Sequence, residues 1–474
     1  MLDREALKIA VEKAWNESIC DELCRYIRIP NKSPAFDSDW QKNGYMAAAM
    51  EQVVSWCRRQ NVEGMTIQEL SLPDRTPLLL IEVEGNGKDT VLLYGHIDKQ
   101  PEMTGWSPGK GPWQPVIEGD RLYGRGGADD GYAVFASLTA IRNLQEQGCS
   151  HSRCVLVIEA SEESGSDDLP AYLEHFGDRI GQPDLVLCLD SGCGDYETLW
   201  ATSSLRGLLT ADLHIRIQQE GMHSGKGSGV VPGWHQLLSL LLSRIEDPVS
   251  GRVFPPELNA EIPYEHQQQA GVTADLIRES FFSSYSFPEG SRALSEDVRE
   301  LLLNQTWRPT LTVTGLDGVP LVRNAGNVTL PDVRARLSLR LPPTCQASVA
   351  ARFLKETMEK DPPFGAHVSL VNVEVACGWK TPDMEPWLVE ALNKASLDFF
   401  GRAPAFIGEG GSIPFMGMLG KSFPEAQFLI TGLLGPRSNA HGPDEFLHIP
   451  MFKKLTAAIS SIIDSHYRFR KGGM

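Results

Sequence analysis

Residues 90–98 read Thr-Val-Leu-Leu-Tyr-Gly-His-Ile-Asp, an apolar run that ends in a histidine and an aspartate. Two further apolar runs follow, at 155–158 and 185–189. Between the first two runs, the apolar residues of 132–147 recur at helical spacing and end before a glycine. A helix between two buried strands is typical of a parallel sheet covered by helices. This part of the chain therefore predicts an α/β domain.

The pattern changes after about Leu205. Half-exposed strands are expected at 209–217, 310–314 and 333–341, with helices at 237–245 and 347–359, and a stretch rich in Pro, Glu and Gln spans 247–269. Helices return at 385–400 and 452–467. We expect a catalytic domain built from 1–205 and 385–474, with a mixed, largely parallel sheet and helices on both faces. An α+β lid or dimerisation domain, 206–384, is expected as an insertion.

The composition narrows the class of protein. The chain has 474 residues, 42% of them hydrophobic and 22% charged, which is typical of folded globular domains. Its formal net charge of -17 argues against nucleic acid or an anionic membrane as a partner, because phosphates would be repelled. The first residues are charged and lack a signal-peptide pattern, and no run of about 18 apolar residues occurs. The nine scattered cysteines are expected to be reduced thiols, and we predict a cytoplasmic protein.

Potential metal ligands follow each of the three predicted strands. His96 and Asp98 end the first strand, Glu162 and Glu163 come shortly after the second, and Asp190 directly follows the third. The carboxyl ends of parallel strands open onto the functional crevice of an α/β sheet. These side chains are therefore expected to converge in space.

A fourth acidic segment, Asp129-Asp130, follows a glycine-rich stretch and directly precedes the helix expected at 132–147. Each signal has an ordinary explanation, since such a pair can cap a helix and Glu162-Glu163 is typical of a solvated helix face. Acids placed directly after successive apolar runs are costly, however, unless a cation pairs with them. The joint pattern predicts a metal centre.

The chain resembles a known family in five segments that occur in the family's order. They are 94–98 (Tyr-Gly-His-Ile-Asp), 124–129 (Gly-Arg-Gly-Gly-Ala-Asp), 162–165 (Glu-Glu-Ser-Gly), 189–190 (Leu-Asp) and 440–445 (Ala-His-Gly-Pro-Asp-Glu). The family is that of the co-catalytic di-zinc peptidases, which includes carnosinases, cytosolic non-specific dipeptidases, glutamate carboxypeptidases, aminoacylases and succinyl-diaminopimelate desuccinylases. The resemblance implies an enzyme that cleaves amide or peptide bonds.

The resemblance also implies a ligand set for two zinc ions, with manganese or cobalt as substitutes. Asp129 would bridge ions about 3.5–4 Å apart. One ion would take His96 and Asp190, and the other Glu163 and His441. The family often has x-Lys-Gly after the bridging aspartate, whereas this chain has Asp130-Gly131, so Asp130 stays open as an alternative ligand. The usual Asn-Glu near the last histidine is replaced by Asp-Glu at 444–445.

Further roles are implied by the same resemblance. Glu162 would be the general base that activates a bridging hydroxide, and Asp98 would orient the His96 imidazole. The residues expected to contact substrate are His223, which often acts from a neighbouring subunit, and Arg340, Asn327, Gly411 and Ser412. A homodimer formed through the lid is expected.

The reaction class is clearer than the substrate. Asp190, where some relatives have glutamate, favours peptidases that need a free amino terminus, as does the lid segment 307–311. A dipeptidase is therefore predicted. An N-acyl-amino-acid deacylase or desuccinylase is the alternative, because the same chemistry cleaves either bond. A non-catalytic relative and a two-metal phosphoesterase are the other classes, but the first would be expected to lose ligands and the second lacks support from the lid.

Overall fold

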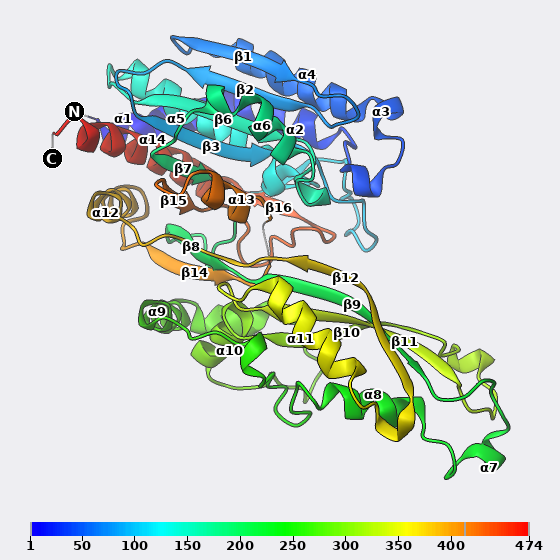
Figure 1. The fold of residues 1–474 in the computed structure, drawn as a ribbon. Coiled ribbons are helices and arrows are strands. Elements are labelled where there is room, and N and C mark those ends of the chain that lie inside the picture. Colours follow the sequence, from blue (N-terminus) through cyan, green and yellow to red (C-terminus); the bar gives the residue numbers. More distant parts are fainter. Residues whose placement is uncertain (1, 412–413, 473–474) are drawn as a thin grey trace.

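The structure, a computed structural model, describes residues 2–411 and 414–472. Its largest sheet has nine strands in the order β1-β2-β6-β3-β7-β15-β8-β13, with β14 also paired to β8 (Figure 1). The four central strands run parallel: β6 (Arg153–Glu159), β3 (Thr90–His96), β7 (Leu185–Cys188) and β15 (Gln427–Ile430). Antiparallel pairings occur outside this group, for example between β1 (Met65–Leu70) and β2 (Leu78–Val83). The predicted α/β class is confirmed.

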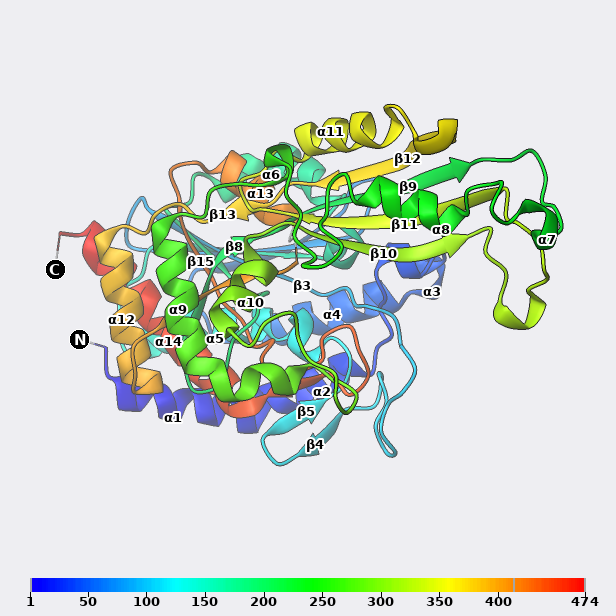
Figure 2. The ribbon, with the colours of Figure 1, turned by 90° about the horizontal axis from the view of Figure 1, so that it is seen from below.

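Helices cover both faces of this sheet. Alternate residues of β3 point to opposite sides, so Val91 and Leu93 join one core while Leu92 and Tyr94 join the other. The first core is shared with α1 (Arg4–Ala14), α2 (Cys20–Ile27), α4 (Tyr45–Arg58), α5 (Ala133–Glu146), α12 (Pro386–Phe400) and α14 (Ile449–Arg470), and the second with α6 (Leu169–Ile180) and α13 (Pro414–Ser422). Figure 2 shows α1, α12 and α14 along one side of the molecule. No helix among the described residues combines the length and apolar character needed to cross a bilayer.

A second, antiparallel sheet forms the extended lower part of the molecule in Figure 1. Its strands are β10 (Thr310–Asp317), β11 (Asp332–Leu341), β9 (Gly207–Arg216) and β12 (His367–Ala376), in that order. Alternate residues of β9 and β11 are buried against α8 (Trp234–Leu242) and α11 (Ala347–Glu359). This is the α+β insertion that the alternating pattern indicates.

Two helices were missed within the expected insertion. α9 (Tyr264–Phe281) begins inside the stretch that the sequence marks only as rich in Pro, Glu and Gln, and α10 (Val298–Thr306) follows it. Both pack into the core of the large sheet, where Thr273 Oγ1 donates a hydrogen bond to the Phe406 carbonyl of β14 (Ala405–Glu409). β13 (Trp379–Lys380) also pairs with β8 (Trp200–Leu205) of the large sheet. The domain limits therefore stay a prediction.

A small three-stranded sheet connects distant parts of the chain. β5 (Arg121–Tyr123) lies between β4 (Val116–Glu118) and β16 (Phe446–His448). β5 precedes the segment that leads to Asp129, and β16 follows the loop that carries His441. The pairing therefore brings a loop near the C-terminus to the carboxyl ends of the central strands.

Candidate active site

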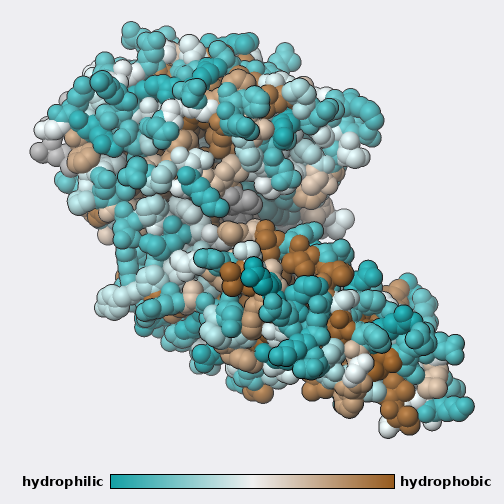
Figure 3. Space-filling view, in the orientation of Figure 1, coloured by the Kyte–Doolittle hydropathy of each residue, from teal (hydrophilic) through white to brown (hydrophobic). Residues whose placement is uncertain are grey.

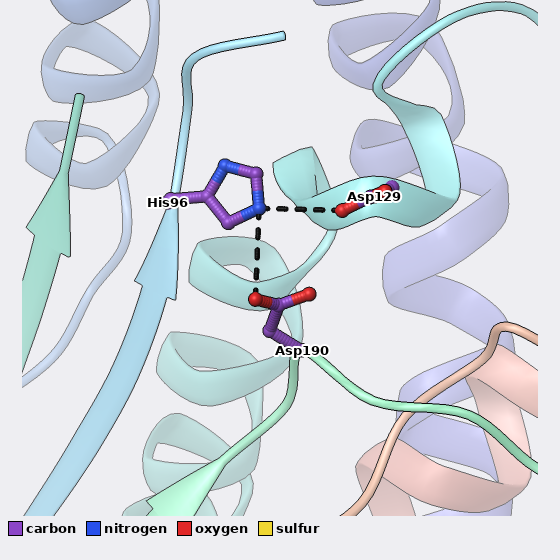
Figure 4. Close-up of side chains that lie close together, drawn as sticks. All are labelled: His96, Asp129 and Asp190. Atoms are coloured by element: carbon purple, nitrogen blue, oxygen red, sulfur yellow. Dashed lines mark hydrogen bonds and ion pairs between the residues drawn. The ribbon is translucent and has the colours of Figure 1, made fainter. Parts of the chain in front are cut away.

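His96, Asp129 and Asp190 form a buried group (Figure 4). His96 is the last residue of β3, and Asp190 follows β7, its parallel neighbour. The His96 Nε2 atom lies 3.3 Å from Asp129 Oδ1 and 3.8 Å from Asp190 Oδ2. Two carboxylates around one imidazole nitrogen make up a ligand set suited to a divalent metal ion.

Asp129 also belongs to a second group, with Glu163 and His441. The His441 Nε2 atom lies 3.0 Å from Asp129 Oδ2 and 3.4 Å from Glu163 Oε2. The two oxygens of Asp129 thus face different histidines. Such a shared carboxylate is the arrangement that bridges paired metal ions.

The rival ligand Asp130 lies outside both groups. Residues 127–131 form an irregular turn in which Asp129 and Asp130 have non-helical backbone angles. The Asp130 Oδ2 atom instead accepts the backbone N–H of His96 at 3.3 Å. Asp130 therefore binds the backbone at the end of β3, whereas the Asp129 side chain points towards the candidate metal ligands.

The charges of the cluster fit bound cations. Burial and the charge of Asp129 raise the pKa of Glu163 well above its usual value, and burial raises the pKa of Asp190 to about 6. Burial also opposes the ionisation of Asp129, but hydrogen bonds from His441 and His96 outweigh it and lower the pKa of Asp129. Buried carboxylates that repel one another are stabilised in their charged form by metal ions. The donor set therefore fits a pair of divalent metals.

The Asp98 carboxylate contacts both His96 and the turn that carries Glu162 and Glu163. Its Oδ1 atom is 3.4 Å from His96 Nδ1, on the side of the ring away from Asp129. The same carboxylate accepts the backbone N–H of Glu162 at 3.1 Å and of Glu163 at 2.9 Å. Asp98 thus contacts the His96 imidazole and also the turn that carries both glutamates, and the second contact is not predicted by the sequence.

Glu162 lines an open cavity of about 430 Å³ above the cluster. Asp129, Asp190 and His441 line the same cavity, together with apolar side chains such as Ile407 and Leu434. Glu162 is absent from both ligand groups, unlike its neighbour Glu163. Burial and the charge of Asp190 raise the pKa of Glu162 well above its usual value, which is the direction expected of a carboxylate that accepts and returns a proton.

The loop that carries His441 is held in place by charged contacts. His441 has a φ of 64°, in the left-handed region that few non-glycine residues occupy, so the surrounding contacts must enforce this conformation. Glu445 forms a buried ion pair with Arg125 and accepts the backbone N–H of Gly126 at 2.8 Å. Arg125 also donates to the Gly442 carbonyl at 2.9 Å. These contacts tie the loop to the segment that leads into Asp129.

The predicted substrate-binding residues are distributed unevenly. Gly411 lines the cavity, and Ser412 lies outside the described residues. Arg340, on β11, is half-buried and pairs with Leu208 near the start of β9. The buried Arg206 lies close to it, directly before β9. His223 and Asn327 adjoin each other near α7 (Ser224–Gly227), at the far end of the lid in Figure 1, and the structure does not bring them to the metal groups.

Three further side chains at the site were missed in the sequence. Gln100 donates a hydrogen bond to Glu163 Oε2 at 2.6 Å. Arg206 donates to the Gly410 carbonyl at 3.3 Å, next to Gly411. Glu409, the last residue of β14, lines the cavity, and burial raises its pKa to about 7. The signal for Glu409 was present, because it is one more acid at a strand end.

The family model for peptidase family M20/M25/M40 matches residues 92–465. A cysteinylglycine-S-conjugate dipeptidase from Corynebacterium striatum is 29% identical over 75% of this chain and 76% of its own length. The human Beta-Ala-His dipeptidase is 24% identical over 74% of this chain and 69% of its own. The solved structure of the dipeptidase Dug1p from Saccharomyces cerevisiae, 20% identical, covers 98% of this chain and 99% of that chain with a TM-score of 0.77. This chain belongs to peptidase family M20/M25/M40.

Proposed function

We propose that this protein is a dipeptidase that uses two metal ions and Glu162 as its general base. The observation that carries the proposal is the pair of ligand groups sharing Asp129, with Glu162 beside them in an open cavity and outside both groups. His96 and Asp190 would hold one ion, Glu163 and His441 the other. Mixed imidazole and carboxylate ligands suit Zn²⁺, with Mn²⁺ or Co²⁺ as substitutes.

The reaction follows from the roles of these side chains. Two bound cations would lower the pKa of a water molecule towards neutrality and polarise the carbonyl of the scissile bond. Glu162 accepts the proton of the attacking water and then delivers it to the leaving nitrogen. Asp98 accepts the backbone N–H groups of Glu162 and Glu163 and thereby fixes the turn that carries both the base and the metal ligand.

A dipeptide is the substrate class that the relatives support. The named activities of the bacterial and human relatives are both dipeptidase activities, which favours a dipeptide over an acylated amino acid. The cavity is bounded by the turn after β7 and by Gly411, and its volume of about 430 Å³ suits a small molecule. Arg340 would bind the substrate carboxylate through its planar guanidinium group.

A second copy of the chain would complete the site. His223 and Asn327 lie at the far end of the lid, so a partner's lid is the natural source of a histidine that contacts substrate. β12 is an edge strand of the lid sheet, and its alternate residues Val371, Val373 and Val375 are 39%, 38% and 48% exposed. Figure 3 shows apolar side chains gathered along the lid. An exposed apolar edge of this kind favours a homodimer formed through the lid.

The test is amine release from a panel of dipeptides and N-acyl amino acids. The protein is stripped of metal and then reloaded with Zn²⁺ or Mn²⁺. Metal-dependent cleavage of free-amino dipeptides is expected. Cleavage of acylated substrates alone would replace the dipeptidase with a deacylase, and no cleavage by protein with demonstrated bound metal would contradict the proposal.

A further inference from the structure

Gln100 contacts the carboxylate of Glu163, a candidate ligand in the group that contains His441. Its side-chain amide donates a hydrogen bond to Glu163 Oε2 at 2.6 Å, and His441 Nε2 lies 3.4 Å from the same oxygen. The Glu163 side chain is 3% exposed, so water has little access to this contact. A carboxylate oxygen has two lone pairs, and accepting one N–H leaves the other for a cation. The hydrogen bond therefore fixes the direction in which Oε2 can bind a metal ion.

The backbone contacts of Glu163 leave its carboxylate unconstrained. Asp98 accepts the N–H groups of Glu162 and Glu163, which fixes the turn but not the side chains that extend from it. A glutamate side chain has several torsions, and all of them must be ordered before the carboxylate can serve as a ligand. Among the described residues, Gln100 is the hydrogen-bond donor to this carboxylate. Gln100 therefore supplies the constraint that Asp98 does not.

Ser33 connects the backbone next to Gln100 with the turn that carries Glu163. Its N–H donates to the Lys99 carbonyl at 2.9 Å, and its hydroxyl shares a hydrogen bond with the hydroxyl of Ser164. Ser33 is fully buried, so water does not compete for these contacts. The residue before Gln100 and the residue after Glu163 are thus held by the same serine. This arrangement keeps the amide and the carboxylate within hydrogen-bonding distance of each other.

We propose that Gln100 is a positioning residue that orients the Glu163 carboxylate for the metal ion held by Glu163 and His441, and thereby raises the affinity for that ion. The inference rests on the proposed two-metal function and extends it to a residue outside the described lining of the cavity. Gln100 acts through Glu163 and contacts neither substrate nor the other ligand group. Its loss should therefore weaken one ion and leave the ion of His96 and Asp190 in place.

The experiment is a stepwise titration of metal-stripped protein with Co²⁺, followed by calorimetry and visible absorption. Wild-type protein should bind two ions, and the step that weakens in Glu163→Gln belongs to the group of Glu163. Gln100→Met keeps the length of the side chain but removes the donor. It should weaken the same step by about 10- to 100-fold and alter the absorption band of that ion. The other step should keep its wild-type affinity.

Gln52 provides the matched control. It is half-buried like Gln100, and its amide donates to the Glu22 carbonyl at 2.7 Å and to Glu22 Oε2 at 3.3 Å, in the contact between α4 and α2. Gln52→Met should leave both titration steps unchanged. Gln100→Asn covers the case in which Gln100→Met does not fold. It keeps the amide but is one carbon shorter, so it should also lose the bond and weaken the step of Glu163.

The outcomes separate this inference from the proposed function. Wild-type protein that binds fewer than two ions would overturn the two-metal centre itself. Two wild-type steps that stay unchanged in the folded Gln100 variants would overturn the role of Gln100 and leave the metal centre standing. Equal losses in both steps, or the same loss in Gln52→Met, would also overturn that role, because they would reveal a general loss of structure.

Discussion

The Asp98 carboxylate accepts the backbone N–H of Glu163 at 2.9 Å and lies 3.4 Å from the Nδ1 atom of His96. Asp98 therefore contacts one residue of each metal group. Asp98→Asn should therefore weaken both sites, because the amide nitrogen would face an N–H donor. We expect metal affinity and kcat/KM to fall about 10- to 100-fold. Metal titration and steady-state kinetics measure the two effects.

Asp168 provides the matched control for this substitution. Its carboxylate accepts the backbone N–H and the hydroxyl of Thr76 at 2.9 and 2.8 Å, outside the active site. Asp168→Asn should lower the thermal midpoint but leave kcat/KM of the folded enzyme near the wild-type value. Equal kinetic losses in the two variants would show that Asp98 acts only through stability.

The adjacent glutamates should respond differently to the same change. Glu162→Gln should reduce kcat by about 10²- to 10⁴-fold with two metal ions still bound, because only the proton acceptor is lost. Glu163→Gln should instead lower the metal content of the second group, since it removes a charged ligand. Metal analysis beside turnover distinguishes them, and near wild-type turnover in Glu162→Gln would refute its role as base.

Glu445 should affect metal binding without touching a metal. Its buried pair with Arg125 anchors the loop that presents His441, so Glu445→Gln should loosen that loop. We expect affinity for one of the two ions to fall about 10-fold or more, with the His96 group retained. Stepwise metal titration measures this. Two unchanged binding steps would show that the loop holds its shape without the ion pair.

A mixed dimer tests whether the lid acts across subunits. Glu162→Gln and His223→Ala homodimers should each be inactive or strongly impaired. A heterodimer of the two variants contains one site with an intact Glu162 and the partner's intact His223, so about half of the wild-type activity should return. Verified heterodimers without such recovery would place both residues in sites formed by one chain.

The stability of the metal-free protein should depend on pH through Glu159. Burial raises the pKa of this carboxyl to about 7, whereas an unfolded glutamate has a pKa of about 4.3. The folded state therefore binds the extra proton, and stability falls as pH rises from about 4.3 to 7, by about 3 kcal/mol from this group. Glu159→Gln should flatten the dependence in denaturant unfolding. Parallel curves for both proteins would contradict it.

Local patterns in the chain are sufficient for much of the fold and for part of the site. The runs at 90–94, 155–158 and 185–189 predict β3, β6 and β7, because a strand buried on both faces needs continuous apolar residues. Acids directly after such strands predict a metal centre, because unpaired charges there are costly. Within the insertion, α9 and α10 are not predicted, because their long polar faces conceal the few residues that pack on β14.

The remaining parts depend on contacts between distant segments. Nothing near His441 marks it as a ligand, and the family resemblance alone suggested it. It reaches Asp129 because β16 pairs with β5 and because Glu445 pairs with Arg125 from 320 residues away. Glu409 likewise reaches the cavity that Asp190 lines only because β14 joins the large sheet. Local sequence therefore predicts the central strands and the ligands that directly follow them, because strand propensity and apolar patterning are local properties. The positions of the loops depend instead on pairing between segments that are far apart in the sequence.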